Sequence, residues 1–192
     1  MFIVVLFTGC QETHQIRSST LLDNVVSEDG EEYKFEQIEW FTNKEKLIDN
    51  GHIPSDNITE LDDERIKLVE TVEFNDPQTD AIVIYSFFND EFVGGEYIII
   101  VENEEELITI SKELKTTLSE EFPPPLANTL DELSEETIRD GKSSGVRWWA
   151  EDNSGFNISV SASSSTDSTE YILNIQVFGP REVPNSLKDF ID

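Results

Sequence analysis

The chain has 192 residues, with 41 acidic against 13 basic side chains and a formal net charge of −28. Hydrophobic residues make up 37% of it, which is enough for a hydrophobic core and argues against disorder of the whole chain. The negative field repels phosphate backbones, so we expect no nucleic-acid partner and favour a basic protein instead. The length suits one folded domain with a short appendage.

Cysteine and histidine are scarce. Cys10 is the one cysteine, which excludes a disulfide within the chain and a metal cluster built on cysteines. Of the two histidines, His14 lies in a polar stretch typical of a tether, so a histidine-based catalytic or zinc site would depend on His52 alone. We therefore expect no cofactor and no catalytic residue.

The N-terminal residues 1–7 are uninterruptedly apolar. A run of this length cannot span a bilayer, which needs about 20 residues, but it fits the apolar region of a signal peptide. Residues 6–10 read LFTGC and resemble the lipobox of bacterial lipoproteins, with Phe7 where leucine is usual. The resemblance implies cleavage before Cys10 and attachment of diacylglycerol to its sulfur.

This resemblance divides the chain into three parts. Residues 1–9 are expected to be part of a lipoprotein signal peptide, residues 10–30 a lipidated cysteine with a flexible tether, and residues 31–192 a single acidic domain. No basic residue precedes the apolar run, so we expect the natural start to lie upstream of Met1. The alternative is an N-terminal strand that buries an unmodified Cys10.

Local patterns predict four elements in the first part of the domain. Residues 33–41 alternate imperfectly and predict a strand, and residues 43–50 predict a short helix that ends at Gly51. Residues 55–64 are expected to form an acidic loop or one helical turn. Residues 65–74 place their apolar side chains at alternate positions and predict a second strand.

The centre of the chain carries the clearest signals. Two runs rich in β-branched and aromatic residues, 81–88 and 97–101, predict a hairpin across a polar break. An amphipathic helix follows, with Asn103 as its N-terminal cap and the prolines 123–125 at its end.

A second helix and three strands complete the domain. Capping-box spacing predicts the helix over residues 129–140, and the strands are expected at 145–151, 156–162 and 170–178. The order of elements predicts an α+β fold, with a mostly antiparallel sheet of about five to six strands covered by two helices.

The candidate binding surface consists of Arg147, Trp148 and Trp149. Neighbouring residues of a strand face opposite sides of the sheet, so we expect at most one of the two tryptophans in the core. The other would offer a platform for a sugar ring or a partner protein, beside Arg147. Packing within a covered sheet is the alternative.

Residues 152–157 read DNSGFN and contain oxygen donors that suit loose Ca²⁺ association. They lack the spacing of an EF-hand loop, so we expect a hairpin turn there and no metal site.

Together these patterns predict a lipid-anchored lipoprotein on the extracytoplasmic face of the cell membrane. Its domain would be a non-enzymatic binding module of the cell envelope, with a basic protein or an envelope polymer as partner. Two alternatives belong to other classes: an envelope hydrolase with paired carboxylates, and an acidic inhibitor or immunity-type protein that binds a basic partner.

Overall fold

The computed structural model describes residues 25, 32–55, 58–62, 64–73, 78–101, 103–121, 124–130, 136, 138, 144–150, 152–164 and 169–180. The expected anchor at Cys10, the tether apart from Val25, and most of the predicted helix over 129–140 lie outside the described residues.

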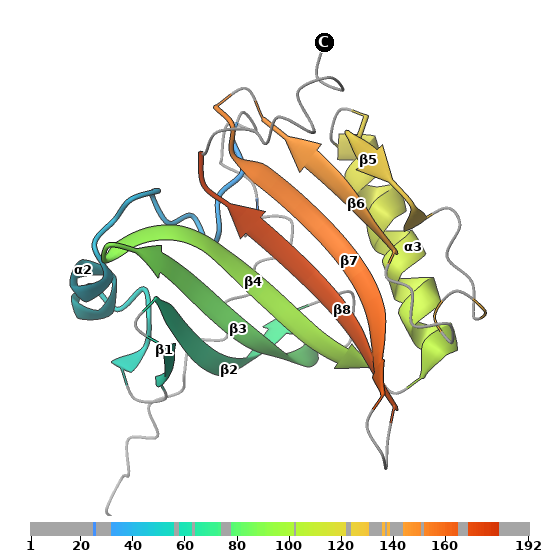
Figure 1. The fold of residues 1–192 in the computed structure, drawn as a ribbon, viewed down its shortest axis with the longest axis horizontal. Coiled ribbons are helices and arrows are strands. Elements are labelled where there is room, and N and C mark those ends of the chain that lie inside the picture. The colour runs from blue at the N-terminus through green and yellow to red at the C-terminus, as the bar shows by residue number, and fades with distance from the viewer. Residues whose placement is uncertain are drawn as a thin grey trace, which may run out of the picture.

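Eight strands form one antiparallel sheet in the order β1-β2-β3-β4-β8-β7-β6-β5 (Figure 1). The strands are β1 (Thr59–Asp62), β2 (Arg65–Glu73), β3 (Gln78–Phe88), β4 (Glu91–Val101), β5 (Ala127–Asn128), β6 (Ser144–Trp149), β7 (Gly155–Ser164) and β8 (Thr169–Phe178). Each half of the sheet is a meander of four consecutive strands. The last strands of the two halves, β4 and β8, pair at the centre.

Within the described residues, two helices accompany the sheet, α2 (Lys44–Asp49) and α3 (Glu104–Glu121). The side chain of Asn43 caps α2, and Gly51 follows that helix with a φ of 74°. As predicted, Asn103 caps α3, since its Oδ1 accepts a hydrogen bond from the Glu106 backbone N–H at 2.9 Å. Helix α3 contacts β4 and β8.

One face of the sheet, which we call the inner face, carries the hydrophobic core. Its buried strand side chains are Ile66, Leu68, Ala81, Val83, Tyr85, Phe87, Phe92, Tyr97, Ile99, Val101, Val146, Trp148, Phe156, Ile158, Val160, Leu173, Ile175 and Val177. Leu107 of α3, Leu47 of α2 and Phe35 belong to the same cluster. The opposite side, the outer face, carries the alternate residues of the strands.

The predicted α+β fold class is wrong. In the part of the chain that the structure describes, a sheet of eight antiparallel strands is accompanied by two short helices, so the sheet dominates the fold. The prediction missed β1 and β5. Strand β1 has four exposed residues and β5 has two, so neither shows the alternation of a half-buried strand. Pairing with β2 and β6, respectively, makes these segments strands.

The predicted strand over residues 33–41 is also wrong. Glu36, Gln37 and Phe41 have φ values of 52°, 58° and 63°, which are incompatible with an extended strand. The alternating aromatic residues of this segment pack against the sheet instead of pairing in it. Trp40, for example, stacks on Phe92 with ring centroids 5.4 Å apart.

The other predicted strands are confirmed, with shifted ends. Residues 65–74 and 81–88 correspond to β2 and β3, and the last three strands correspond to β6, β7 and β8. Strand β4 begins at Glu91, earlier than the predicted start at residue 97. Asn89 and Asp90 have positive φ values of 52° and 63°, as a tight hairpin turn between β3 and β4 requires.

Candidate functional site

The structure separates the two tryptophans of the predicted binding surface. Trp148 is buried on the inner face and stacks on Phe156 at 5.4 Å between ring centroids. Trp149 and Arg147 are half-buried on the outer face. The expectation of at most one core tryptophan is therefore confirmed, while binding at this surface stays a prediction.

Trp149 is one member of an aromatic pair on the outer face. Its ring meets the edge of Phe178 with centroids 4.9 Å apart. The Phe178 ring lies across Gly155, where a Cβ atom would come within 1.9 Å of the ring. The glycine therefore lets Phe178 lie flat against β7 beside Trp149.

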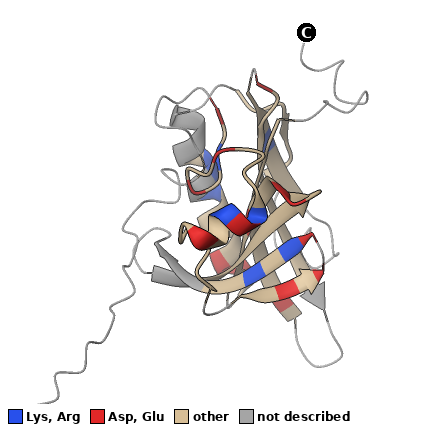
Figure 2. Ribbon diagram, turned by 90° about the vertical axis from the view of Figure 1, so that its left-hand side faces the viewer, with Lys and Arg blue, Asp and Glu red and all other residues tan. Residues whose placement is uncertain are grey.

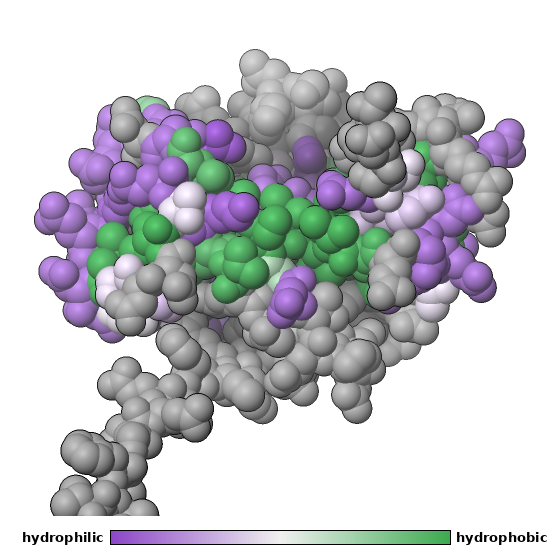
Figure 3. Space-filling view, turned by 90° about the horizontal axis from the view of Figure 1, so that it is seen from below, coloured by the Kyte–Doolittle hydropathy of each residue, from purple (hydrophilic) through white to green (hydrophobic). Residues whose placement is uncertain are grey.

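The outer face also exposes large apolar side chains. Val69 is 63% exposed, Phe88 60% and Ile100 48%. Their neighbours in the chain, Leu68, Phe87 and Ile99, are buried on the inner face. Seen from below, hydrophobic side chains gather in a band between hydrophilic ones (Figure 3). In the strand register Val69 lies across from Ile82 and Ile98, next to Ile100, whereas Phe88 lies at the β3–β4 turn. A contiguous exposed apolar patch is typical of a binding site.

A buried carboxylate lies on the inner face. Glu36 is 9% exposed, and its two carboxylate oxygens accept hydrogen bonds from the hydroxyl of Tyr85 at 2.6 Å and that of Tyr97 at 3.1 Å. The tyrosines belong to the neighbouring strands β3 and β4. Burial of a carboxylate is costly unless donors satisfy it, and these two hydroxyls are such donors. We call Glu36, Tyr85 and Tyr97 the buried carboxylate cluster.

Gly95 makes room for this cluster. A Cβ atom at Gly95 would come within 2.2 Å of the Phe35 ring, so the ring lies directly on the backbone of β4. Phe35 packs against Tyr97 at 4.8 Å and edge-on against Tyr85 at 5.5 Å between centroids. The close approach of Phe35 therefore brings the next residue, Glu36, to the tyrosine hydroxyls.

Sequence reasoning missed the buried carboxylate cluster, because Glu36 is one of 41 acidic residues and lies in a segment predicted to be a strand. A glycine inside a strand often marks the close approach of another backbone or side chain. The pair Gly94-Gly95 was therefore the signal that could have found it.

The turn at residues 152–155 forms a hydrogen bond with residue 33, at the beginning of the segment that packs on the sheet. The Asp152 side chain accepts a hydrogen bond from the Ser154 N–H at 2.7 Å, and Asn153 has a φ of 67°. Ser154 Oγ accepts a hydrogen bond from the buried Tyr33 N–H at 3.0 Å. These contacts are those of the predicted hairpin turn. Within the described residues, no group of three or more His, Cys, Asp or Glu side chains is placed to hold a metal ion.

An ion pair closes the turn between β1 and β2. Arg65 donates to Asp62 Oδ2 from Nε at 2.8 Å, and this hydrogen bond lowers the pKa of the exposed Asp62 carboxyl. Figure 2 shows acidic and basic residues interspersed on α2 and the neighbouring strands.

Comparison with family models, curated proteins and solved structures finds no significant match for this chain. Among the described residues, no helix combines the length and apolar character needed to cross a membrane.

Proposed function

We propose that this chain is a bacterial lipoprotein, held on the extracytoplasmic face of the membrane by a lipid on Cys10. Its sheet domain is a non-enzymatic binding module of the cell envelope. The observation that carries the binding function is the outer face, where Val69, Phe88 and Ile100 are exposed while the core cluster of the described residues packs on the other face.

The net charge of the chain indicates which kind of partner it favours. A net charge of −28 favours encounter with a basic protein or a basic envelope polymer and disfavours anionic surfaces. The anchor supports the same location, because a cysteine that carries diacylglycerol and a further acyl chain stays stably on the membrane. The buried carboxylate cluster favours a structural role over a catalytic one, because its carboxylate oxygens accept hydrogen bonds from tyrosines inside the core.

The intact mass of the protein expressed from its native locus tests the anchor. The expected species begins at Cys10 and carries the mass of acyl chains, and a Cys10→Ser variant carries none. A wild-type species that keeps Met1 and a free thiol would overturn the lipoprotein proposal. An acidic inhibitor of a basic partner would then be the leading hypothesis.

A further inference from the structure

Strand β1 covers only the beginning of the edge strand β2. Thr59, the first residue of β1, pairs with Lys67, and the remaining pairs lie between Lys67 and the β1–β2 turn. Strand β2 continues to Glu73, and all 9 of its residues pair with β3 on the other side. Within the part of the chain that the structure describes, the outer edge of β2 from Leu68 to Glu73 has no paired strand.

The opposite edge of the sheet is protected differently. Strand β5 pairs with the middle of β6, and Leu126 and Thr129 extend this pairing through backbone hydrogen bonds of 2.8 Å each to Arg147 and Gly145. The two edges therefore differ. Among the described residues, the open part of β2 has backbone N–H and C=O groups without a strand partner on its outer side, and such groups can template a further strand.

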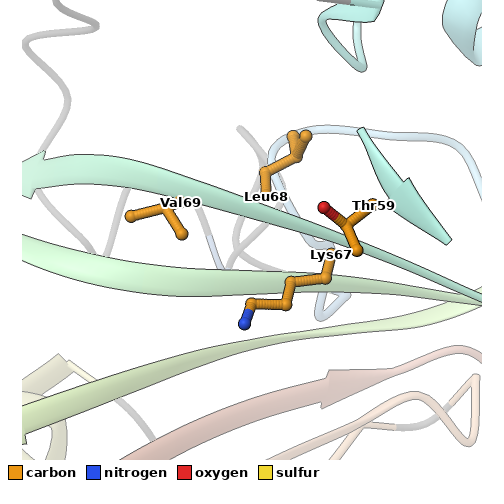
Figure 4. Close-up of a pocket in the computed structure, with 4 residues that line it drawn as sticks. All are labelled: Thr59, Lys67, Leu68 and Val69. Carbon is orange, nitrogen blue, oxygen red and sulfur yellow. The ribbon is translucent and has the colours of Figure 1, made fainter. Parts of the chain in front are cut away.

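A hollow marks the point where β1 leaves β2. Its volume is about 380 Å³, and Thr59, Lys67, Leu68 and Val69 line it (Figure 4). Val69 is the most exposed large apolar residue among those described. A strand that continued the line of β1 along β2 would place an alternate side chain against Val69, on the same face of the sheet.

The sequence that contains β1, β2 and the beginning of β3 is strongly acidic. Residues 56–80 contain nine acidic side chains and two basic ones, Arg65 and Lys67, for a net charge of −7. Both basic residues lie in the part of β2 that β1 already covers. Beyond Lys67 the strand contains Glu70 and Glu73 and no basic residue. A strand added there is therefore favoured electrostatically if it is cationic.

We infer that β2 beyond Lys67 accepts an extended, cationic segment of a partner protein as an additional strand. Backbone hydrogen bonds supply affinity, and an apolar side chain at alternate positions of the segment enters the hollow beside Val69. This inference rests on the proposed binding function and specifies its site and partner.

The probe is a synthetic heptapeptide of alternating Lys and Val, added to the full 192-residue chain. Calorimetry measures its affinity, and amide hydrogen exchange by NMR locates it. We expect every second amide from Leu68 to Glu73 to gain protection, because alternate N–H groups of an edge strand point outward. Methylation of the alternate peptide nitrogens should weaken binding by roughly tenfold or more, and a Glu/Val peptide should not bind.

A matched pair of variants separates the edge from general attraction. Val69→Lys places a positive charge at the open edge. Ile100→Lys places one at a similarly exposed position of β4, a strand in the middle of the sheet. We expect Val69→Lys to weaken binding several-fold more than Ile100→Lys, because only the first repels a cationic strand on β2.

Three results would overturn the inference: full affinity of the methylated peptide, equal effects of the two lysine variants, or amides of β2 that are already protected on both sides without peptide. Peptide binding elsewhere on the domain would overturn the edge site and leave the proposed binding function standing. An unmodified Cys10 would overturn the lipoprotein proposal and leave this experiment unaffected.

Discussion

The two faces of the sheet treat neighbouring residues of the same type in opposite ways. Phe87 is 3% exposed and Phe88 60%, and Ile99 is 0% exposed and Ile100 48%. Residue type therefore does not decide burial in this protein. The parity of the residue in the pleated strand decides it in these two pairs, because Phe87 and Ile99 point into the core of the inner face, whereas Phe88 and Ile100 point to the outer face. Among the described residues, no side chain buries these two outer-face residues.

The largest expected change in stability comes from truncation of one isoleucine on each face of the sheet. Ile99→Ala should lower the free energy of unfolding by about 2–5 kcal/mol, because it leaves a cavity in the core. Ile100→Ala should lower it by less than about 1 kcal/mol, since the side chain is already half in water. Urea unfolding of both variants measures the two values. Equal costs would show that the outer face is covered in solution.

Two adjacent glycines of β4 allow the same comparison of the two faces, because a substitution by alanine adds a methyl group to one face or the other. Gly95→Ala drives a methyl group into the buried Phe35 ring, and we expect a loss of about 1–3 kcal/mol or more. A Cβ atom at Gly94 would meet the Val177 carbonyl oxygen at 3.1 Å, which is a tight contact but far less severe than the overlap at Gly95. Gly94→Ala should therefore cost much less than Gly95→Ala, and the restriction of the unfolded chain by alanine offsets part of that cost.

Thermal or urea unfolding compares these two variants, with the far-UV spectrum as a control for the fold. A neutral Gly95→Ala variant would mean that Phe35 does not lie on β4, and the position of Glu36 would then have to be revised as well.

The buried carboxylate cluster provides a third, smaller test. Tyr85→Phe removes the 2.6 Å hydrogen bond to Glu36 and should lower the free energy of unfolding by about 1.5–3 kcal/mol, the range for bonds to charged groups. The same substitution in a Glu36→Gln background should cost about 0.5–1.5 kcal/mol, the range for neutral groups. A double-mutant cycle by urea unfolding gives the coupling. Equal costs in the two backgrounds would contradict the role of the carboxylate.

The strands with one buried face could be predicted from the sequence. Residues 65–69 of β2, residues 172–177 of β8 and all of β6 alternate between buried and exposed or half-buried positions, and that period of two is visible in the sequence. Strand β1 could not be predicted, because its four residues are all exposed and its structure depends on pairing with β2. Single-sequence patterns report burial, and an edge strand without burial has no such pattern.

The candidate sites show the same limit. The opposite faces of Trp148 and Trp149 followed from strand geometry alone. The position of Glu36 did not, because it depends on contacts with Tyr85 and Tyr97, which lie 49 and 61 residues away in the chain. The alternation of residues 33–41 predicted a strand, although Tyr33, Phe35 and Trp40 instead pack on the inner face from outside the sheet.

The smallest expected effect is on the stability of the folded chain at alkaline pH, and it involves Tyr33. This side chain packs on Phe156 of the inner face, and its burial raises the pKa of the phenol above its ordinary value. The folded chain therefore keeps this proton at a pH where the unfolded chain, with a tyrosine pKa of about 10, has lost it. Because the folded state then binds more protons, its stability falls as the pH rises above about 10, by up to about 1.4 kcal/mol per pH unit.

Tyr33→Phe removes this proton and should flatten the decline of the unfolding free energy between about pH 10 and pH 11. The other three tyrosines, Tyr85, Tyr97 and Tyr171, are present in both proteins, so the difference in slope belongs to Tyr33. Urea unfolding at a series of pH values measures it. Parallel curves would show that the phenol ionises freely in the folded chain. Tyr33 would then lie outside the core, and the hydrophobic core would end at Phe156 without including residues 33–41.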